Sequence, residues 1–290
     1  MRDAVFYFEK PVEECPRELR KMQELKANVP NFVHSADLIE ENGANPQIAK
    51  DAYTHLAPMV DTDVYMRWLL KEVSLAGCDV RQMKISGCLV DEEERLKREF
   101  DVDVIVNCTG LGARELANDN MYPLRGALIR VNNDGRTMPR VTKAHCVSYD
   151  ESKAAQNMIF IVPRGKDMLL IGGLAEPDEW DKAISLDNYP PIRDMLKRCI
   201  NFLPILKDAE IDSIESVRVG LRPLRREKQD VRLEQERQRG TCIIHNYGHG
   251  GSGVTLSWGC AMEVVEITEK LLAMDSLLAF KLPSAFAPTI

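Results

Sequence analysis

The chain has 290 residues, of which 44% are hydrophobic and 29% are charged, the composition of an ordinary globular protein long enough for one large domain or two. Its net charge of −7 and the lack of a long basic run argue against a nucleic-acid-binding surface. No apolar stretch approaches the roughly 20 residues that a transmembrane helix needs, so we expect neither nucleic acid nor membrane as a partner.

Eight cysteines are scattered singly along the chain, and none forms a Cys-x-x-Cys pair. Several lie in apolar stretches, which favours small core residues over disulfides or metal ligands, so no metal site is predicted. A reducing compartment fits this pattern, and we expect a cytoplasmic protein. Met1-Arg2-Asp3-Ala4 does not resemble a secretory signal, and Pro288-Thr289-Ile290 is not a peroxisomal address of the Ser-Lys-Leu type.

The first 60 residues carry the weakest pattern. A short helix is predicted from Pro16 to Leu25, and the mixture of Pro, Asn, Gly and acidic residues over 28–46 indicates irregular surface. A better helix is predicted over residues 64–76, with Asp61-Thr62-Asp63 as its N-terminal cap and Gly77 just past its end. The apolar stripe of this helix consists of Tyr65, Trp68, Leu69 and Val73.

A strand pattern follows this helix. Residues 80–85 predict a short strand, and the charge run over residues 91–99 predicts a solvated turn or helix face. Residues 102–108 predict a buried strand that ends at Thr109-Gly110. The order helix, strand, strand is typical of one half of a doubly wound α/β fold.

From Tyr122 onward the pattern changes to short strands separated by turns, which predicts an antiparallel β-rich unit. One helix is predicted within it, near residues 190–202. The strands are predicted at residues 126–131, 159–162, 168–172 and 214–219.

The most informative stretch runs from Thr241 to Met274. An apolar run over residues 241–247 predicts a buried strand, Gly248-His249-Gly250-Gly251-Ser252-Gly253 follows it, and from Val254 the pattern becomes helical. A strand, a glycine loop and a helix together direct backbone N–H groups and the positive end of the helix toward an anionic ligand. The helix carries an apolar face made of Trp258, Ala261, Met262, Val265 and Leu272.

The same loop matches the Gly-x-Gly-x-x-Gly dinucleotide fingerprint. That fingerprint also needs a following parallel strand with an acidic residue about 20 residues on, and the residues after Leu272 do not supply one, so we reject a Rossmann βαβ unit here. A cofactor loop of another kind remains open. So does a tight strand-to-helix corner in which only glycine fits.

Three segments carry a family resemblance. They are Val104-Ile105-Val106-Asn107-Cys108-Thr109-Gly110, Gly220-Leu221-Arg222-Pro223-Leu224-Arg225, and the run from His245 to Leu256. Together with Pro123-Leu124-Arg125-Gly126 and the run from Val162 to Gly173, they resemble the D-amino-acid oxidase family, which is FAD-dependent and includes D-aspartate oxidase. The resemblance extends from about Asp61 to Ala273.

The resemblance implies an α/β fold in two parts. An incomplete, doubly wound FAD-binding domain would consist of residues 1–121 and 241–290, and an antiparallel β-rich substrate-binding domain would consist of residues 122–240. The implied reaction is the oxidative deamination of a D-amino acid. A hydride passes from Cα to flavin N5, oxygen reoxidises the flavin to give hydrogen peroxide, and water converts the imino acid into a keto acid and ammonia.

The resemblance also assigns substrate-binding residues. The family's carboxylate-binding arginine falls at Arg222, whose planar guanidinium suits a carboxylate, and an ordinary ion pair is the alternative. Gly251 falls where the family's backbone carbonyl accepts a hydrogen bond from the substrate amine. The family's pocket tyrosines fall near Gln156 and Phe160, so both hydroxyls are lost, and Ser252 replaces a frequent aromatic residue. We therefore expect an altered substrate preference.

The cofactor that the resemblance implies is FAD. The helix that starts within residues 250–255 would direct its positive end at the reduced flavin, and Ile85 would contribute backbone contacts on the adenosine side. His245 and His249 are interpreted as structural. The implied cofactor-binding residues are Ile85, Cys108, Thr109, Gly110, Gly250, Gly251, Ser252, Gly253, Val254 and Thr255.

One departure from the family concerns its first strand and Gly-x-Gly-x-x-Gly loop, which hold the FAD pyrophosphate. Nothing similar precedes Asp61, and Gly43 is the only glycine there. We therefore expect weak FAD binding, and exposed sheet edges that favour self-association or a completing N-terminal segment.

Three functions stay open at this point. They are a shortened flavin oxidase of D-amino acids, an FAD-free and non-catalytic interaction module, and an oxidase of glycine, sarcosine or another secondary amine. An acidic D-amino acid would need a second cation in the pocket, for which Arg125, Lys143 and Arg164 are candidates.

Overall fold

The computed structural model describes residues 1–147, 158–226, 230–238 and 240–279, with the backbone alone for residues 274–279. The chain divides into two compact units. Unit 1 consists of residues 1–81 and 125–220, and unit 2 consists of residues 82–124 and 221–290. These boundaries differ from those drawn on the sequence, because residues 1–81 lie with the 125–220 segment and not with the C-terminal residues. The assignment of one unit to substrate and the other to FAD stays a prediction.

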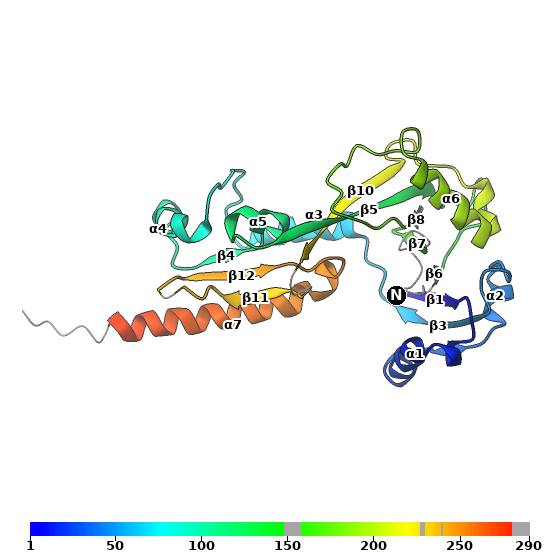
Figure 1. Ribbon diagram of the computed structural model, residues 1–290, viewed down its shortest axis with the longest axis horizontal. Helices are drawn as coiled ribbons and strands as arrows, with labels where there is room; N and C mark the ends of the chain where they lie inside the picture. The colour runs from blue at the N-terminus through cyan, green and yellow to red at the C-terminus, as the bar shows by residue number, and fades with distance from the viewer. Residues whose placement is uncertain (148–157, 227–229, 239, 280–290) are drawn as a thin grey trace, which may run out of the picture. The chain divides into compact units, whose positions relative to one another are not determined.

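A large mixed sheet forms the centre of unit 1 (Figure 1). Its strands are β1 (Arg2–Phe8), β2 (Val33–His34), β3 (Asp51–Ala57), β5 (Met121–Asn132), β6 (Ala144–Val147), β7 (Ile159–Arg164), β8 (Met168–Gly172), β9 (Glu176–Pro177) and β10 (Val217–Arg225). The strand order is β10-β5-β8-β7-β6-β1-β3-β2, with β9 paired to β5. The first residues of β5 and the last residues of β10 belong to unit 2.

The sheet of unit 1 includes strands that the sequence pattern does not predict. Strand β1 pairs with β3 in antiparallel fashion and with β6 in parallel fashion, from Ala4↔Ala144 to Tyr7↔Val147. The first 60 residues are therefore more regular than expected, and the sheet is mixed and not purely antiparallel. The successive residues Tyr7 and Phe8 are both buried, so both faces of β1 lie against protein and its side chains do not alternate between apolar and polar.

The helix predicted over residues 190–202 is confirmed as α6 (Pro190–Phe202). It begins with two prolines, which are tolerated in the first helical turn because the N–H groups there have no intrahelical partner. Its buried residues Ile192, Met195, Cys199 and Phe202 recur every three or four positions and pack toward β7 and β8. The short 3-10 helix η4 (Pro204–Asp208) follows it.

The N-terminal part of unit 1 adds the 3-10 helix η1 (Val12–Glu14), α1 (Pro16–Asn28) and α2 (Leu38–Glu41). The short helix predicted from Pro16 is confirmed as α1. It covers an aromatic cluster around the buried Tyr53, whose ring centroid lies 5.3 Å from those of both Phe8 and Phe32. This cluster fixes the positions of η1 and of the start of β3.

The helix predicted over residues 64–76 is confirmed as α3 (Thr62–Leu75), which begins two residues earlier and ends one residue earlier than predicted. The Asp61 carboxylate accepts hydrogen bonds from the N–H groups of Asp63 and Val64, and Gly77 follows the helix with a φ of +82°. No residue of α3 is buried, so the predicted apolar stripe does not form part of a described core. Its most exposed apolar side chains are Val64, Met66, Trp68, Leu70, Val73 and Leu75.

A three-stranded sheet of order β11-β12-β4 forms the centre of unit 2. Its elements are α4 (Leu89–Phe100), β4 (Ile105–Asn107), η2 (Gly110–Gly112), α5 (Ala113–Leu116), β11 (Arg232–Gln235), β12 (Ile243–Tyr247) and α7 (Gly253–Ala279). Strand β12 pairs in parallel with β4 and in antiparallel fashion with β11, and α7 runs along β11 and β12 (Figure 1). The predicted α/β character is confirmed at this coarse level.

Two strand predictions in unit 2 need correction. Residues 80–85 form no strand, because Val80 and Met83 are exposed and the segment pairs with no described strand. The strand predicted over residues 102–108 is limited to β4, and Val102 and Val106 are each 41% exposed, so the strand is not buried on both faces. The charge run over residues 91–99 lies in α4, as expected for a helix with a solvated face.

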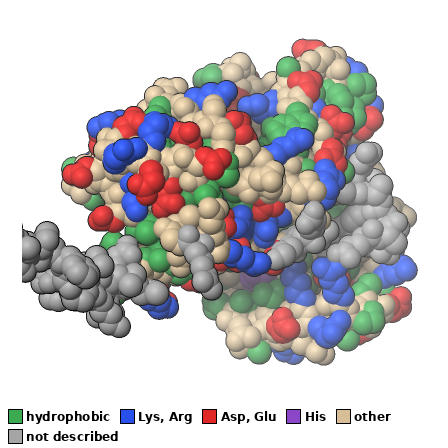
Figure 2. Space-filling view, turned by 60° about the vertical axis from the view of Figure 1, so that its left-hand side comes forward, with side chains coloured by type: hydrophobic (Ala, Val, Ile, Leu, Met, Phe, Trp, Pro, Cys, Tyr) green, Lys and Arg blue, Asp and Glu red, His purple; other side chains and the backbone are tan. Residues whose placement is uncertain are grey.

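The charged side chains on the surface bear on whether nucleic acid is a partner, and the helices bear on whether a membrane is. On the face shown in Figure 2, Lys and Arg side chains are interspersed with Asp and Glu side chains over much of the surface. None of the described helices is long and apolar enough to cross a membrane.

Candidate functional site

The three segments that carry the family resemblance converge within unit 2. Strands β4 and β12 place Asn107 opposite His245. The N–H of Gly250 donates to the carbonyl of Pro223 over 2.9 Å, and a Cβ added to Gly110 would lie 3.7 Å from the Pro223 ring. The ends of β4, β10 and β12 therefore meet around Pro223, although they are far apart in the sequence.

The glycine corner, residues 248–253, packs tightly against β10. Gly250 has a φ of +54°, and an added Cβ would lie 2.7 Å from Leu224 Cδ2. Gly248 has a φ of +87°, and an added Cβ would lie 2.9 Å from Arg225 Cδ. Only glycine fits these two positions without strain, which supports the corner interpretation for both. Gly251 is different, because it is exposed and its backbone lies open to a ligand.

Helix α7 starts directly after this corner. The carbonyl of Ser252 accepts the N–H of Leu256, and the N–H of Ser252 donates to His249. The first N–H groups of any α-helix have no intrahelical partner, and here they belong to Gly253 and the residues after it. These positions are exposed or half-buried, so a negatively charged group can approach the positive end of α7.

Arg222 lies beside the corner. A Cβ added to Gly251 would lie 3.7 Å from Arg222 Cδ and 4.0 Å from its Nε. The Nη1 atom of Arg222 is buried and finds no hydrogen-bond partner among the described residues. Burial lowers the pKa of the Arg222 guanidinium, and no described carboxylate offsets that effect. This half-buried guanidinium thus has one buried donor left unused beside exposed backbone, and a carboxylate is the kind of acceptor that suits such a donor.

The end of β4 is held by a hydrogen-bonded chain. Thr109 Oγ1 donates to Asn107 Oδ1 over 2.7 Å, and Asn107 Nδ2 lies 3.3 Å from His245 Nδ1. His245 Nε2 lies 2.8 Å from a Glu236 oxygen, and burial lowers the pKa of His245 although Glu236 favours its charged form. All polar ring atoms of His245 are thus occupied within the protein, which favours its structural interpretation.

Comparison with known proteins identifies the family of this chain. The family model described as FAD dependent oxidoreductase matches residues 3–267. This chain belongs to the FAD-dependent oxidoreductase family. The match begins at residue 3, so it includes the N-terminal strands that lie outside the resemblance noted from Asp61 onward.

Curated relatives that are similar to this chain in sequence include amino-acid oxidases. The D-amino-acid oxidase of Rubrobacter xylanophilus is 38% identical over 231 residues, which cover 79% of this chain and 63% of that protein. The D-amino-acid oxidase of Dictyostelium discoideum is 36% identical over 230 residues, covering 76% and 58% respectively. D-aspartate oxidase 1 of Caenorhabditis elegans is 30% identical and covers 69% and 55%. The chain spans about three fifths of the length of these curated relatives.

Solved structures of lower sequence identity share the fold. Glycine oxidase from Geobacillus kaustophilus superimposes with a TM-score of 0.71 at 16% identity, covering 93% of this chain and 71% of that one. L-alpha-glycerophosphate oxidase from Mycoplasma pneumoniae, solved with FAD bound, gives a TM-score of 0.69 at 14% identity, covering 92% and 73%. At these identities the likeness shows the fold alone.

A second polar cluster, centred on Asp119, could not be recognised from the local sequence. The Asp119 carboxylate accepts hydrogen bonds from Arg225 Nε over 3.0 Å and from the Tyr247 hydroxyl over 2.8 Å. The same hydroxyl accepts a hydrogen bond from Arg232. Asp119 thus ties the end of β10 to β12, and only the folded structure brings these residues together.

The other residues predicted to contact the cofactor or to line the substrate pocket do not all belong to unit 2. Ile85 lies in a connecting segment of unit 2 and packs against the Leu89 and Leu96 cluster. Cys108 is exposed at the end of β4. Phe160 is half-buried on β7 in unit 1, among Ala4, Ala144 and Val162. Gln156 lies outside the described residues.

The three candidates for a second cation in the substrate pocket all belong to unit 1. They differ in whether the charged group already has a partner. Arg125 donates to Glu176 over 2.6 and 2.9 Å and to the Tyr189 hydroxyl over 3.0 Å, so its charge is already neutralised. Arg164 donates from Nη1 to the carbonyl of Val60, and its buried Nε has no hydrogen-bond partner among the described residues. Lys143 is half-buried. Arg164 and Lys143 therefore remain candidates, and Arg125 does not.

Proposed function

We propose that this chain provides the flavin-facing and carboxylate-binding parts of a D-amino-acid-oxidase-like enzyme, which deaminates a D-amino acid oxidatively to a keto acid, ammonia and hydrogen peroxide. The single observation that carries the proposal is the buried, unpaired Nη1 of Arg222 beside the open backbone of Gly251. A carboxylate would complete the hydrogen bonds of this guanidinium and offset its buried charge.

The residues of unit 2 fit a flavin. The end of β4 and the start of α7 include exposed residues, and the positive end of α7 would favour the negative charge that a bound flavin carries after reduction. When bound, FAD would accept the hydride from the substrate Cα. The residues proposed to contact it are Ile85, Cys108, Thr109, Gly110, Gly250, Gly251, Ser252, Gly253, Val254 and Thr255.

The proposed roles of the chain's own residues are binding and orientation. Arg222 holds the substrate carboxylate, and the carbonyl of Gly251 accepts a hydrogen bond from the substrate amine, which fixes the direction of the Cα–H bond. The absence of a side chain at Gly251 lets the substrate approach closely. The chain Glu236–His245–Asn107 orients Thr109. Phe160 and Gln156 are proposed to line the substrate side.

A second candidate is a non-catalytic, FAD-free member of the family that acts as an interaction module. The observation that favours it is the exposed apolar surface of α7, where Trp258, Met262 and Val265 are each more than half exposed. Surface of this kind commonly marks an interaction site. This candidate predicts a folded but colourless protein.

Titration of the purified full chain with FAD tests both candidates. Flavin that stays with the protein after free FAD has been removed by gel filtration, together with peroxide formation from D-amino acids, supports the oxidase. A colourless protein that gains nothing from FAD at any concentration below the solubility limit supports the interaction module. Hydrogen peroxide is measured with neutral and acidic D-amino acids and with glycine and sarcosine, which separates the substrate classes.

Arg222→Leu tests the substrate role. Removing one partner of a buried charged hydrogen bond costs about 2–5 kcal/mol, so KM for the amino acid should rise at least about 30-fold while FAD binding persists. Arg237→Leu, in which an exposed arginine of unit 2 is removed, is the matched control and should leave KM unchanged. An unchanged KM in Arg222→Leu would remove Arg222 from the site.

A further inference from the structure

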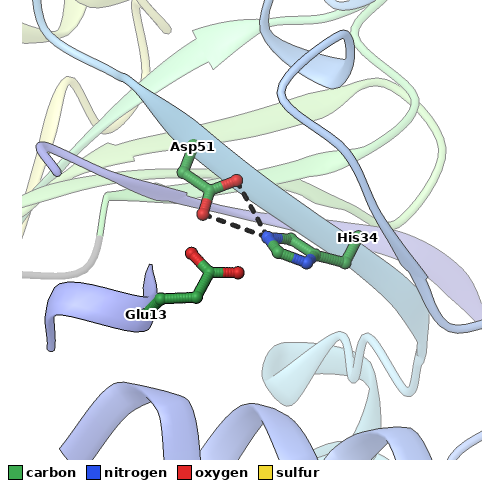
Figure 3. A group of neighbouring side chains, drawn as sticks. All are labelled: Glu13, His34 and Asp51. Atoms are coloured by element: carbon green, nitrogen blue, oxygen red, sulfur yellow. Dashed lines mark hydrogen bonds and ion pairs between the residues drawn. The ribbon is translucent and has the colours of Figure 1, made fainter. Parts of the chain in front are cut away.

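Three side chains from separate elements converge at the end of the unit 1 sheet (Figure 3). Glu13 lies in η1, His34 ends β2 and Asp51 begins β3. Their ligand-type atoms, one from each residue, all lie within 4.8 Å of one another. Figure 3 shows the Glu13 carboxylate turned toward Asp51 and toward the same ring nitrogen of His34 that faces Asp51. The site belongs to unit 1 and shares no residue with the Arg222 site.

The fold positions these residues through backbone pairing. Strand β1 ends opposite β3 with Phe8 paired to Asp51, and η1 follows β1 at once, which brings Glu13 over the start of β3. On the other side β2 pairs with β3, with His34 opposite Tyr53. Side chains two residues apart on a strand lie on the same face, so Asp51 and Tyr53 share a face.

Asp51 is a rigid centre for this group. Its side chain is only 9% exposed, and its two oxygens accept backbone N–H groups of Val12 over 2.9 Å and of Ala52 over 2.8 Å. His34 Nε2 lies 2.9 and 3.0 Å from the same two oxygens. The backbone donors fix the direction of the carboxylate, as the outer hydrogen bonds of metal ligands do.

Glu13 brings a second negative charge to this group. Its carboxylate is exposed, and it makes no hydrogen bond or ion pair that is recorded among the described residues. Two carboxylates within 4.8 Å repel each other unless a cation lies between them. A cation bound there would interact favourably with both.

We propose that Glu13, His34 and Asp51 form a binding site for a divalent cation of the zinc class. One imidazole nitrogen and two carboxylate oxygens are a donor set that suits Zn²⁺ and related transition metals, whereas Mg²⁺ and Ca²⁺ prefer oxygen ligands alone. Three protein ligands with a fourth position open to water are a common zinc arrangement. The metal would replace the proton that Nε2 of His34 shares with Asp51.

Metal binding would require the side chains of His34 and Glu13 to adjust, since the three ligand-type atoms lie within 4.8 Å of one another. Two ligands at about 2.0–2.1 Å from a tetrahedral Zn²⁺ lie roughly 3.3 Å apart, so the contact between His34 and Asp51 must widen by a few tenths of an ångström. The side chain of His34 is 28% exposed and that of Glu13 lies at the surface, so both can adjust around the fixed Asp51. The bound ion would tie η1, β2 and β3 together.

Equilibrium dialysis of the full chain against Zn²⁺, without a histidine tag, tests the site. The wild-type protein should retain one Zn²⁺ that His34→Ala loses, and Glu13→Gln should bind it at least about tenfold more weakly. Glu14→Gln is the matched control, because Glu14 is an exposed neighbour in the same 3-10 helix and lies outside the cluster. Cys15→Ser should also keep the site, since the nearby thiol is not one of the proposed ligands.

Thermal unfolding provides the second readout. Zn²⁺ should raise the Tm of the wild-type protein and of Glu14→Gln, and at the same concentration it should raise that of Glu13→Gln less. If His34→Ala does not fold, the surface variant Glu13→Gln decides. The proposal is overturned if the wild-type protein retains no Zn²⁺, if Glu13→Gln binds it as tightly as the wild type, or if Cys15→Ser abolishes binding.

Discussion

Arg125 of unit 1, which is buried, and Arg222 of unit 2, which is half-buried with a buried Nη1 atom, differ in what surrounds the guanidinium. Arg125 of unit 1 is 2% exposed and bonds to Glu176, to the Tyr189 hydroxyl and to the Asp181 carbonyl. Burial lowers the pKa of Arg125, but the hydrogen bond and charge of Glu176 outweigh it, so the pKa is raised. Arg222 of unit 2 has no such carboxylate, and burial lowers its pKa.

This difference is the one expected between an arginine that stabilises the fold and the ligand-binding arginine that we propose. The protein itself satisfies Arg125, so its removal should affect folding. The protein leaves Arg222 unsatisfied at Nη1, and an unpaired buried donor lowers stability unless a ligand supplies the acceptor. Two further arginines of the unit 1 sheet resemble Arg125, since Arg130 pairs with Asp212 and Arg218 pairs with Asp63 and Glu215.

The largest expected effect is the loss of stability in Arg125→Leu. The change leaves Glu176 uncompensated in a mostly buried position, which costs about 3–5 kcal/mol of unfolding free energy. Arg222→Leu should cost much less or stabilise the protein slightly, because it removes a charge that has no described partner. Urea unfolding at neutral pH measures both variants, and equal losses would contradict the distinction between the two arginines.

The next effect concerns buried histidines. Burial, with a smaller contribution from Lys143, lowers the pKa of His145 in unit 1 to about 4. The unfolded protein therefore binds a proton near pH 6.5 that the folded protein does not, so stability is complete above pH 6.5 and falls as the pH drops toward 4. The loss reaches about 3 kcal/mol when the pKa falls from 6.5 to about 4.

His145→Gln should flatten this acid dependence, measured as unfolding free energy between pH 7 and pH 4. His245→Gln in unit 2 is the matched variant. It should change the slope less, because Glu236 lies 2.8 Å from its ring and favours the protonated form that burial disfavours. A slope in His145→Gln identical to that of the wild type would show that another group dominates.

The smallest effect lies within unit 2 and compares two glycines. Gly250→Ala places a Cβ 2.7 Å from Leu224 Cδ2 at a φ of +54°, so it should cost about 1–3 kcal/mol and weaken any ligand binding at the corner. Gly259→Ala, in the exposed interior of α7 with nothing within 4 Å of an added Cβ, should stabilise by about 0.5–1 kcal/mol. Thermal unfolding distinguishes the two, and a neutral Gly250→Ala would argue against a tightly packed corner.

Local patterns in the sequence predict several features of this fold. Asp61 and Gly77 mark the ends of α3, because capping and left-handed backbone depend on neighbouring residues alone. The same applies to α6 and to the glycine corner before α7. The strand predicted over residues 80–85 fails because a strand needs a partner, and the local alternation of residues cannot show that none pairs there.

The proposed zinc site could not be predicted from local patterns in the sequence. Glu13, His34 and Asp51 follow no local motif, and they meet only because β3 pairs with both β1 and β2. The same is true of Asp119, whose hydrogen bonds to Arg225 and Tyr247 join parts of the chain that are more than a hundred residues apart.

The sequence by itself determined the FAD-dependent family, the capped helices and the segments around Arg222 and Gly251, because each depends on residue types within a short stretch. The tertiary structure alone decided that residues 1–81 lie with the 125–220 segment, that Arg125 is paired with Glu176, and that Arg222 has an unsatisfied donor. Whether a buried charge has a partner depends on which elements pack around it, and these elements come from distant parts of the chain.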